Sequence, residues 1–224
     1  MTDQTAQLEW RDTDAGAVPI STRFDDPYYS LDNGLAETQH VFLSGNDLPN
    51  RFTDGFHIAE LGFGTGLNFL ATLHSFRASG TEGKLRFTSF EAYPMAFADL
   101  QQALQPYADL PTDVFASDPT DGLKGDDFDL TVITGDASNT LPQWQGQADA
   151  WFLDGFSPAK NPELWDDTLM KEVGRHTKPN GTFATYTAAG RVRRALTNAG
   201  FGVTRVKGFG RKRHMSVGTK RDAE

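Results

Sequence analysis

The chain has 224 residues, a mass of 24.6 kDa and no cysteine, which excludes disulfides, thiolate metal sites and thiol nucleophiles. Apolar residues make up 38% of the chain and aromatic residues 12%, enough for one sizeable core and too many for a disordered chain. No apolar run approaches the roughly 18 residues of a membrane span, and residues 1–20 do not resemble a secretory signal. We therefore expect a cytoplasmic protein without a membrane partner.

The net charge of −9 is unevenly distributed along the chain. Residues 190–224 contain ten basic and two acidic residues and carry +8, whereas residues 1–189 contain 11 basic and 28 acidic residues and carry −17. A basic segment of this kind is typical of a nucleic-acid-binding face. A solvated basic helix and tail explains the charges equally well.

Residues 1–50 are rich in turn sequences and predict an N-terminal extension with short strands, packed on a main domain at 51–224. Within the main domain, predicted strands and helices alternate. The strands are expected at 56–61, 85–90, 130–134, 150–153, 182–186, 202–206 and 213–217. The helices are expected at 67–76, at 95–104, between Asn161 and Pro179, and at 187–198.

This alternation is typical of an α/β fold with a mostly parallel, seven-stranded sheet that helices cover on both faces. Residues 106–128 contain six aspartates and are expected to form a solvent-exposed excursion. In open α/β sheets, ligands bind at the carboxyl ends of the strands. Four predicted strands end in residues suited to binding or catalysis, namely the segment 60–66, Glu91, Asp136 and Asp154.

The segment 60–66 reads ELGFGTG, and its glycines Gly62, Gly64 and Gly66 permit a tight turn and close approach of a ligand to the backbone. The spacing lacks the third glycine of the dinucleotide fingerprint, and no Lys-Ser/Thr pair follows to form a P-loop. The acidic Glu60 suits a ligand with a positive amino group, such as S-adenosylmethionine, better than it suits a pyrophosphate. A plain turn between strand and helix is the alternative.

Three further acids and one lysine are candidates at the neighbouring strand ends. Glu91 lies where a carboxylate accepts hydrogen bonds from ribose hydroxyls, and Asp136 is placed to accept from an adenine amino group and to cap a helix. Partial burial is expected to raise the pKa of Asp154 and make it a proton acceptor near neutral pH. Lys160 is expected to orient Asp154 or to contact a phosphate. A surface glutamate, a turn-forming aspartate and a solvated lysine are the alternatives.

The remaining aromatic and histidine residues give weaker indications. Phe156 and Trp165 are candidates for stacking on a base, with a place in the core as the alternative. The histidines show neither HxH nor HExxH spacing, so no metal site is expected.

Several longer motifs accompany these residues: FDDPYYS at 24–30, NGLAET at 33–38, VFLSGN at 41–46, ELGFGTGLNFL at 60–70, the stretch 149–162 and KGFGRKR at 207–213. Through them, from about Leu8 to Met215, the chain resembles the methyltransferase domain of the MnmC family and its stand-alone relatives. MnmC proteins are bifunctional enzymes of tRNA 5-methylaminomethyl-2-thiouridine biosynthesis. The glycine loop alone indicates only a class I methyltransferase, whereas the stretch around Asp154 and the GFGRKR motif are far more specific.

The resemblance implies a Rossmann-like class I fold that uses S-adenosylmethionine, with neither metal nor flavin on this chain. It implies methylation of the primary amine of 5-aminomethyl(2-thio)uridine at the tRNA wobble position. By matching position, Asp154 is the active-site carboxylate. The cofactor is then surrounded by Glu60, Gly62, Gly64, Gly66, Asn68, Glu91, Asp136 and Asp154.

In the expected mechanism the amine attacks the sulfonium methyl group while Asp154 takes its proton or holds it by a hydrogen bond. The tRNA phosphates are expected to bind Arg191, Arg193, Arg194, Lys207, Arg211, Lys212 and Arg213. The flavin-dependent oxidase of the family has no counterpart in the sequence, so a separate oxidase protein is expected to supply the aminomethyl precursor. The alternatives are a small-molecule amine methyltransferase or an aminopropyltransferase-like enzyme on the same fold, or a non-catalytic RNA-binding module.

Overall fold

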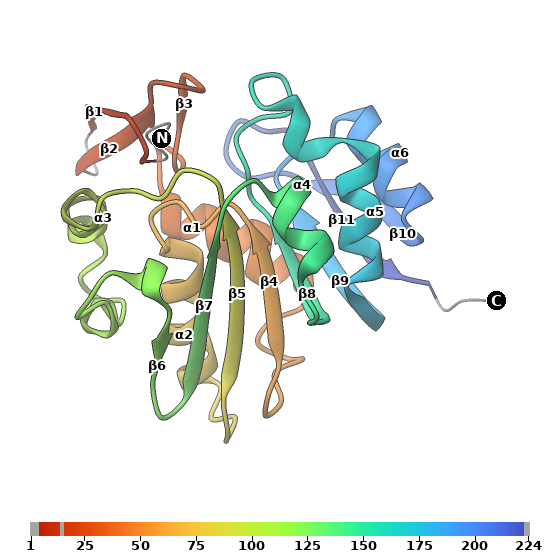
Figure 1. Cartoon of the computed structure of the whole chain (residues 1–224), viewed down its shortest axis with the longest axis horizontal. Helices are drawn as coiled ribbons and strands as arrows, with labels where there is room; N and C mark the ends of the chain where they lie inside the picture. Colours follow the sequence, from red (N-terminus) through yellow and green to blue (C-terminus); the bar gives the residue numbers. More distant parts are fainter. Residues whose placement is uncertain (1–4, 14–15, 222–224) are drawn as a thin grey trace.

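Eight strands form the central sheet of this computed structural model, which describes residues 5–13 and 16–221 (Figure 1). From one edge to the other, the strands are β10 (Phe201–Lys207), β11 (His214–Lys220), β9 (Thr177–Thr185), β8 (Ala148–Leu153), β4 (His57–Leu61), β5 (Leu85–Glu91), β7 (Phe128–Thr134) and β6 (Leu123–Lys124). The five strands from β9 to β7 are parallel. Strand β11 runs antiparallel to β10 and β9, and β6 runs antiparallel to β7.

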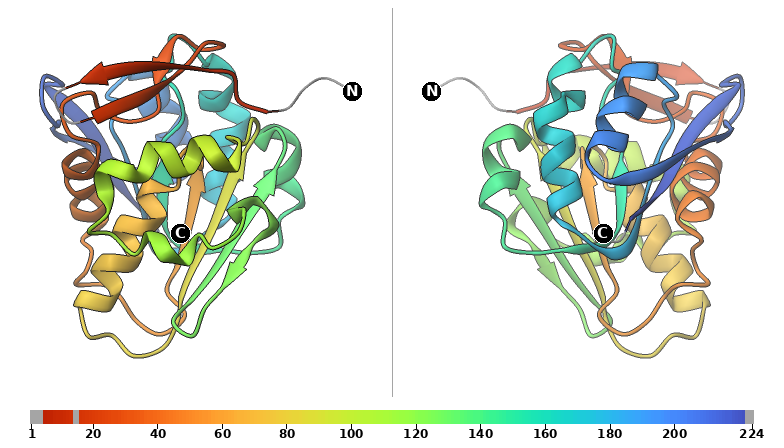
Figure 2. Two further views of the ribbon diagram at one scale, coloured as in Figure 1. Left: turned by 90° about the vertical axis from the view of Figure 1, so that its left-hand side faces the viewer. Right: turned by 90° about the vertical axis from the view of Figure 1, so that its right-hand side faces the viewer.

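Helices cover both faces of the sheet, which explains why every residue of β4 is buried. One core cluster joins a face of the sheet to α2, α3 and a π-helical turn at Gln39–Leu43, and the other joins the opposite face to α4, α5 and α6 (Figures 1 and 2). The helices are α1 (Gly34–Thr38), α2 (Leu67–Ala78), α3 (Phe97–Leu104), α4 (Ala137–Thr140), α5 (Asp167–Arg175) and α6 (Gly190–Asn198). Within the described ranges, no helix is long and apolar enough to cross a membrane.

A small antiparallel sheet lies across one end of the molecule, over the carboxyl ends of the parallel strands (Figures 1 and 2). Its strands are β1 (Leu8–Thr13), β2 (Gly16–Ser21) and β3 (Asp26–Pro27). A backbone hydrogen bond attaches the segment just before β1 to the loop after β5, where the Ala6 amide donates to the Pro94 carbonyl at 2.9 Å. The division of the chain into an extension and a main domain at residue 50 stays a prediction.

The predicted fold class is confirmed, and all seven predicted strands are present. The sheet has an eighth, two-residue strand, β6, at its edge. The helix expected after Asn161 begins instead at α5, because the Asp166 side chain accepts from the Leu169 amide at 2.7 Å and caps it. Asn161 makes no capping bond and precedes only a short 3₁₀ turn. Strand β9 begins before Pro179, earlier than predicted.

The expectation that residues 106–128 form an exposed excursion is only partly correct. The segment contains short 3₁₀ turns and buries Leu110 and Phe115, whose exposed fractions are 6% and 5%. The ring of Phe115 stacks on Phe69 of α2 at a centroid distance of 5.9 Å. Apolar side chains therefore anchor this aspartate-rich segment to the core.

Candidate active site

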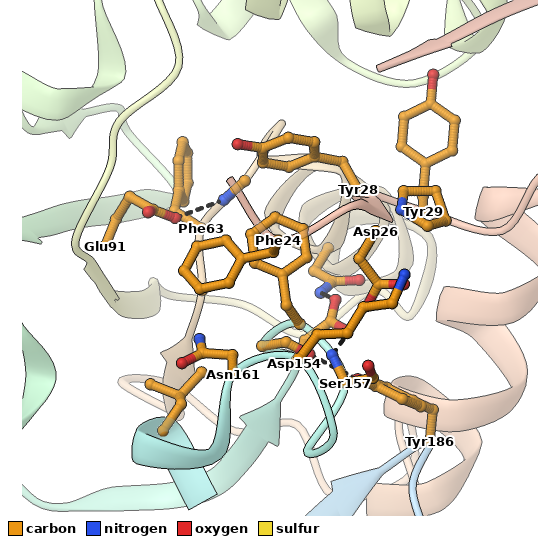
Figure 3. A pocket seen from close by; sticks show the side chains of 18 of the residues that line it. Phe24, Asp26, Tyr28, Tyr29, Phe63, Glu91, Asp154, Ser157, Asn161 and Tyr186 are labelled. Carbon is orange, nitrogen blue, oxygen red and sulfur yellow. Dashed lines mark hydrogen bonds and ion pairs between the residues drawn. The ribbon is translucent and has the colours of Figure 1, made fainter. Parts of the chain in front are cut away.

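A cavity of about 780 Å³ opens at the carboxyl ends of β4, β5, β7 and β8. The loops that follow these strands form part of its wall, and residues 23–30 of the N-terminal segment form another part (Figure 3). Parallel strands bring these loops together because their carboxyl ends lie at one edge of the sheet. Gly62, Gly64, Asp136 and Asp154 belong to these loops, Glu91 ends β5, and Asn68 lies in α2 just after the glycine loop.

The glycine loop after β4 has a backbone that favours glycine. Gly62, Gly64 and Gly66 have φ angles of +92°, +54° and +74°. Residues other than glycine rarely adopt such angles. A Cβ atom on Gly62 would lie only 2.7 Å from the carbonyl oxygen of Asp154. Gly62 and Gly64 line the cavity. Gly66 is not part of the lining. It is the N-cap residue of α2, and a Cβ atom there would meet the ring of Phe115.

Glu91 ends β5 and presents an oriented carboxylate to the cavity. Its Oε2 accepts from the Gly64 amide at 3.0 Å, and its Oε1 accepts from the Tyr93 amide at 2.8 Å. Burial raises the pKa of Glu91, and these amide bonds oppose the rise. Each carboxylate oxygen has a second lone pair, so Glu91 remains suited to accept hydrogen bonds from a ribose diol.

Asp136 follows β7, and it lines the cavity while it also caps a helix. Its Oδ1 accepts from the Ser138 amide at 2.8 Å, which confirms the predicted capping of α4. The predicted contact of Asp136 with an adenine amino group stays a prediction.

Asp154 is held in place by the side-chain amide of Asn68. The Asn68 Nδ2 donates to Asp154 Oδ2 at 2.7 Å and to Glu60 Oε1 at 2.9 Å. The Asn68 Oδ1 accepts from Thr38 Oγ1 at 2.8 Å. Because both ends of the amide are bonded, Asn68 cannot rotate without losing contacts. It therefore fixes the Asp154 carboxylate in the wall of the cavity.

Electrostatics make Asp154 a proton acceptor near neutral pH. Burial, and then the neighbouring Glu37 carboxylate, raise the pKa of Asp154 from 3.8 to about 7. The hydrogen bond from Asn68 and the positive charge of Lys212 oppose this rise. The direction agrees with the expectation from the sequence.

Glu60 is not part of the cavity lining, and its expected place beside the cofactor stays a prediction. Its side chain is fully buried, with an exposed fraction of 0%. Its Oε1 accepts from Asn68, and its Oε2 accepts from Ser89 Oγ at 2.7 Å. Burial raises the pKa of Glu60 well above its usual range. Glu60 is buried because every residue of β4 lies inside the molecule. From there its carboxylate holds the side chain of Asn68.

Lys160 is paired with acids other than Asp154, so its expected role in orienting Asp154 or contacting a phosphate stays a prediction. The Lys160 Nζ lies 3.1 Å from Asp25 Oδ2 and 3.7 Å from Asp26 Oδ1, and it donates to the Asp25 carbonyl. The physical reason is charge, since two adjacent carboxylates attract the ammonium group. Asp26 also accepts from the Ser157 amide at 2.9 Å. Lys160 thus joins the loop after β8 to the N-terminal segment.

Part of the basic C-terminal segment lies beside the cavity. A hollow of about 540 Å³, here called the basic hollow, is lined in part by Arg205, Lys207, Lys212 and Arg213, and Lys212 also lines the cavity. Arg191, Arg194, Lys207, Arg211, Lys212 and Arg213 are exposed, and Arg193 is half-buried. Two of these side chains already have partners, because Arg191 donates to the Pro158 carbonyl and Lys212 pairs with Glu37.

Aromatic residues from the N-terminal segment also line the cavity, and sequence reasoning assigned them no role at the site. Phe24 stacks on Phe156 at a centroid distance of 4.7 Å, and Tyr28 meets Phe156 edge-on at 5.1 Å. In Figure 3, Phe24 lies in the middle of the view, between Glu91 and Tyr186. Residues 24–29 combine three aromatic residues with a turn sequence, and this pattern could have indicated a role at the site. Phe156 is thus at the site, whereas Trp165 is in the core at 2% exposure.

The lining fits S-adenosylmethionine in size and in chemistry. Its volume is within the usual range of small-molecule sites, roughly 300–1,000 Å³. S-adenosylmethionine has a ribose diol, an adenine amino group and positive charges on nitrogen and sulfur. Glu91, Asp136 and Asp154 offer carboxylates to such groups, and Gly62 and Gly64 leave the backbone bare. Among the described residues, no group of three or more His, Cys, Asp or Glu side chains is arranged to hold a metal ion.

Comparison with known proteins agrees with this chemistry. Two similar proteins are both named tRNA 5-methylaminomethyl-2-thiouridine biosynthesis bifunctional protein MnmC. The one from Aeromonas hydrophila is 43% identical over 98% of this chain, and the one from Chromobacterium violaceum is 43% identical over 97%. The chain covers only 36% and 35% of these proteins, about a third of their length. The resemblance to the MnmC family is thereby confirmed.

A crystal structure of MNMC2 from Aquifex aeolicus has the same fold, with a TM-score of 0.77 and 24% identity. It covers 98% of this chain, which itself covers 73% of that chain. The family described as S-adenosyl-L-methionine-dependent methyltransferase matches residues 100–221, more than half of the sequence. The chain therefore belongs to the S-adenosyl-L-methionine-dependent methyltransferase family, and S-adenosylmethionine is its methyl donor.

Proposed function

We propose that this chain methylates the primary amine of 5-aminomethyl(2-thio)uridine at the wobble position of tRNA. The observation that carries the proposal is an acidic corner next to a basic surface. Asp154 and Glu37 in the cavity suit a cationic amine, and the basic hollow beside them suits RNA phosphates. The names of the MnmC relatives support the same substrate class.

Different residues of the cavity bind different parts of the methyl donor in this proposal. We assign the ribose diol to Glu91, the adenine amino group to Asp136, and the methionine part to the bare backbone at Gly62 and Gly64. Glu60 acts as a positioning residue through Asn68, with which it shares a hydrogen bond.

When bound, S-adenosylmethionine supplies a methyl group, whose bond to sulfur breaks as a bond to the acceptor nitrogen forms. A primary alkylamine has a pKa near 10 and is mostly protonated at neutral pH. Asp154, with its pKa raised to about 7, accepts the proton that the nitrogen must lose. Asn68 keeps the carboxylate oriented while the charge shifts.

The test is incubation with tritium-labelled S-adenosylmethionine and tRNA that carries 5-aminomethyluridine, followed by nucleoside chromatography. We expect label in 5-methylaminomethyluridine and none with tRNA that has an unmodified uridine at that position. The substitution Asp154→Asn is expected to lower the rate by about 100-fold or more, with S-adenosylmethionine affinity changed only a few fold. Label on a small amine such as putrescine but not on tRNA would overturn the proposal in favour of a small-molecule enzyme. Binding of tRNA without any transfer would favour a non-catalytic module.

The proposal has two consequences outside the site. A preceding reaction must expose the primary amine on the same uridine, and we propose that a separate oxidase protein supplies it. We also propose a cytoplasmic location, because the proposed substrate is tRNA.

A further inference from the structure

An alkylammonium group already lies in the cavity wall, and it belongs to the protein itself. The Lys212 Nζ is 2.7 Å from Glu37 Oε1 and 4.1 Å from the centroid of the Tyr186 ring. All three residues line the cavity, as does Asp154. The Glu37 side chain is 13% exposed, whereas the Lys212 side chain is 46% exposed. The Glu37 carboxylate is thus largely buried, whereas the Lys212 ammonium group is accessible to solvent.

A carboxylate combined with an aromatic face is a typical binding site for an alkylammonium ion. The carboxylate supplies a charge-assisted hydrogen bond, and the ring attracts the cation by its quadrupole. The proposed acceptor also presents a primary alkylammonium group at neutral pH. The same pair of groups therefore suits both the lysine and the substrate.

Glu37 and Tyr186 are held in place by hydrogen bonds that connect to the network around Asp154. The Tyr186 hydroxyl donates to the Gly155 carbonyl at 2.7 Å, which fixes the ring against the loop after β8. Glu37 lies in α1, and the next residue, Thr38, donates to Asn68. Asn68 donates in turn to Asp154. Lys212, in contrast, comes from the exposed loop between β10 and β11.

Lys212 also connects the cavity to the basic hollow, since it lines both. Without a positive charge in the corner, the Glu37 and Asp154 carboxylates would repel each other. A cation there relieves this repulsion, whether it is Lys212 before substrate binds or the substrate ammonium group afterwards.

We infer that this corner of Glu37 and Tyr186 is the binding site of the acceptor ammonium group, and that Lys212 occupies it until substrate arrives. The inference rests on the proposed function and adds a specificity-determining residue, Glu37, to it. On binding, the substrate ammonium pairs with Glu37 and lies on Tyr186. The displaced Lys212 side chain turns to the basic hollow, where it meets an RNA phosphate.

The test compares two anticodon-arm RNAs that differ only in 5-aminomethyluridine or unmodified uridine at the target position. Their dissociation constants are measured in the presence of S-adenosylhomocysteine, so that no turnover occurs. The wild-type protein is expected to prefer the aminomethyl RNA. Glu37→Gln is expected to weaken binding of that RNA by about 10-fold, the loss of one charge-assisted bond, and binding of the unmodified RNA by less than about twofold.

Two further variants make the test specific. Lys212→Gln removes the resident cation, so we expect it to keep or increase the preference while it weakens the binding of both RNAs. Glu82→Gln is the matched control, because it makes the same change in an exposed loop before β5, at the end of the strand away from the cavity. It should change neither constant. Unfolding temperatures of all variants near that of the wild type exclude a folding defect.

The inference is overturned if Glu37→Gln weakens both RNAs equally or neither, or if Lys212→Gln abolishes the preference. These results are distinct from a failure of the proposed function. A wild-type protein that neither prefers nor methylates the aminomethyl RNA would contradict the function itself. A protein that methylates it while Glu37→Gln retains the full preference would contradict only the role of Glu37.

Discussion

Replacing Asp154 by asparagine should stabilise the free protein, and only at neutral and alkaline pH. A carboxyl group whose pKa is raised on folding binds its proton more tightly in the folded chain than in the unfolded chain. Its ionised form therefore lowers the free energy of unfolding as the pH rises from about 4 through 7. Asparagine removes that charge and can still accept the hydrogen bond from Asn68.

The magnitude follows from the shift in the pKa of Asp154. A rise from 3.8 to about 7, at 1.36 kcal/mol per unit, corresponds to about 4 kcal/mol at pH 8.5. At pH 4 the same relation gives less than about 1 kcal/mol, because the carboxyl group is protonated in the folded chain and only about half ionised in the unfolded chain. For a chain of this length, about 4 kcal/mol raises the unfolding temperature by roughly 10 °C.

The assay is thermal unfolding of the wild type and of Asp154→Asn at pH 4 and pH 8.5, without ligand. Asp109→Asn is the matched control, because Asp109 is exposed and should change the unfolding temperature little at either pH. An Asp154→Asn protein that is not stabilised at pH 8.5 would refute the reasoning. Equal stabilisation at both pH values would refute it too, because the effect would then not come from ionisation.

Three other variants, two single and one double, test separate parts of the site. Gly62→Ala should cost about 2 kcal/mol or more of unfolding free energy, because its φ of +92° and its 2.7 Å approach to the Asp154 carbonyl leave no place for a Cβ; unfolding at wild-type temperature would contradict this. Glu91→Gln should weaken S-adenosylmethionine binding by about 10-fold in calorimetry and leave tRNA binding unchanged; a loss of tRNA binding alone would reverse the assignment. Arg211→Ala combined with Arg213→Ala should lower the slope of log affinity for tRNA against log salt by about 1 to 2 units; an unchanged slope would place the RNA surface elsewhere.

The sequence predicts the positions of Glu91, Asp136 and Asp154 well, because each depends on local structure. Glu91 ends its strand, and Asp154 and Asp136 follow theirs by one and two residues, so parallel strands place all three at one edge of the sheet. The same reasoning does not place Glu60 in the cavity lining, because Glu60 precedes the end of its strand by one residue. That difference places its side chain inside the molecule, at 0% exposure.

Contacts between distant segments could not be predicted from one sequence. Lys160 pairs with Asp25, which lies 135 residues away along the chain, and Lys212 pairs with Glu37 at a separation of 175 residues. No periodicity or spacing encodes such a pairing. It follows from how the N-terminal segment lies over the strand ends, which is a property of the complete fold (Figure 2).

A crystal structure with S-adenosylhomocysteine is the most direct test of the central claim, that the strand-end cavity holds the methyl donor with its sulfur toward Asp154. We predict the ribose hydroxyls at Glu91, the adenine near Asp136, and the sulfur in the part of the cavity bounded by Gly62 and Asp154. Density for the ligand outside this cavity would contradict the account. A ligand bound in the reverse direction, with its sulfur near Asp136, would contradict it equally.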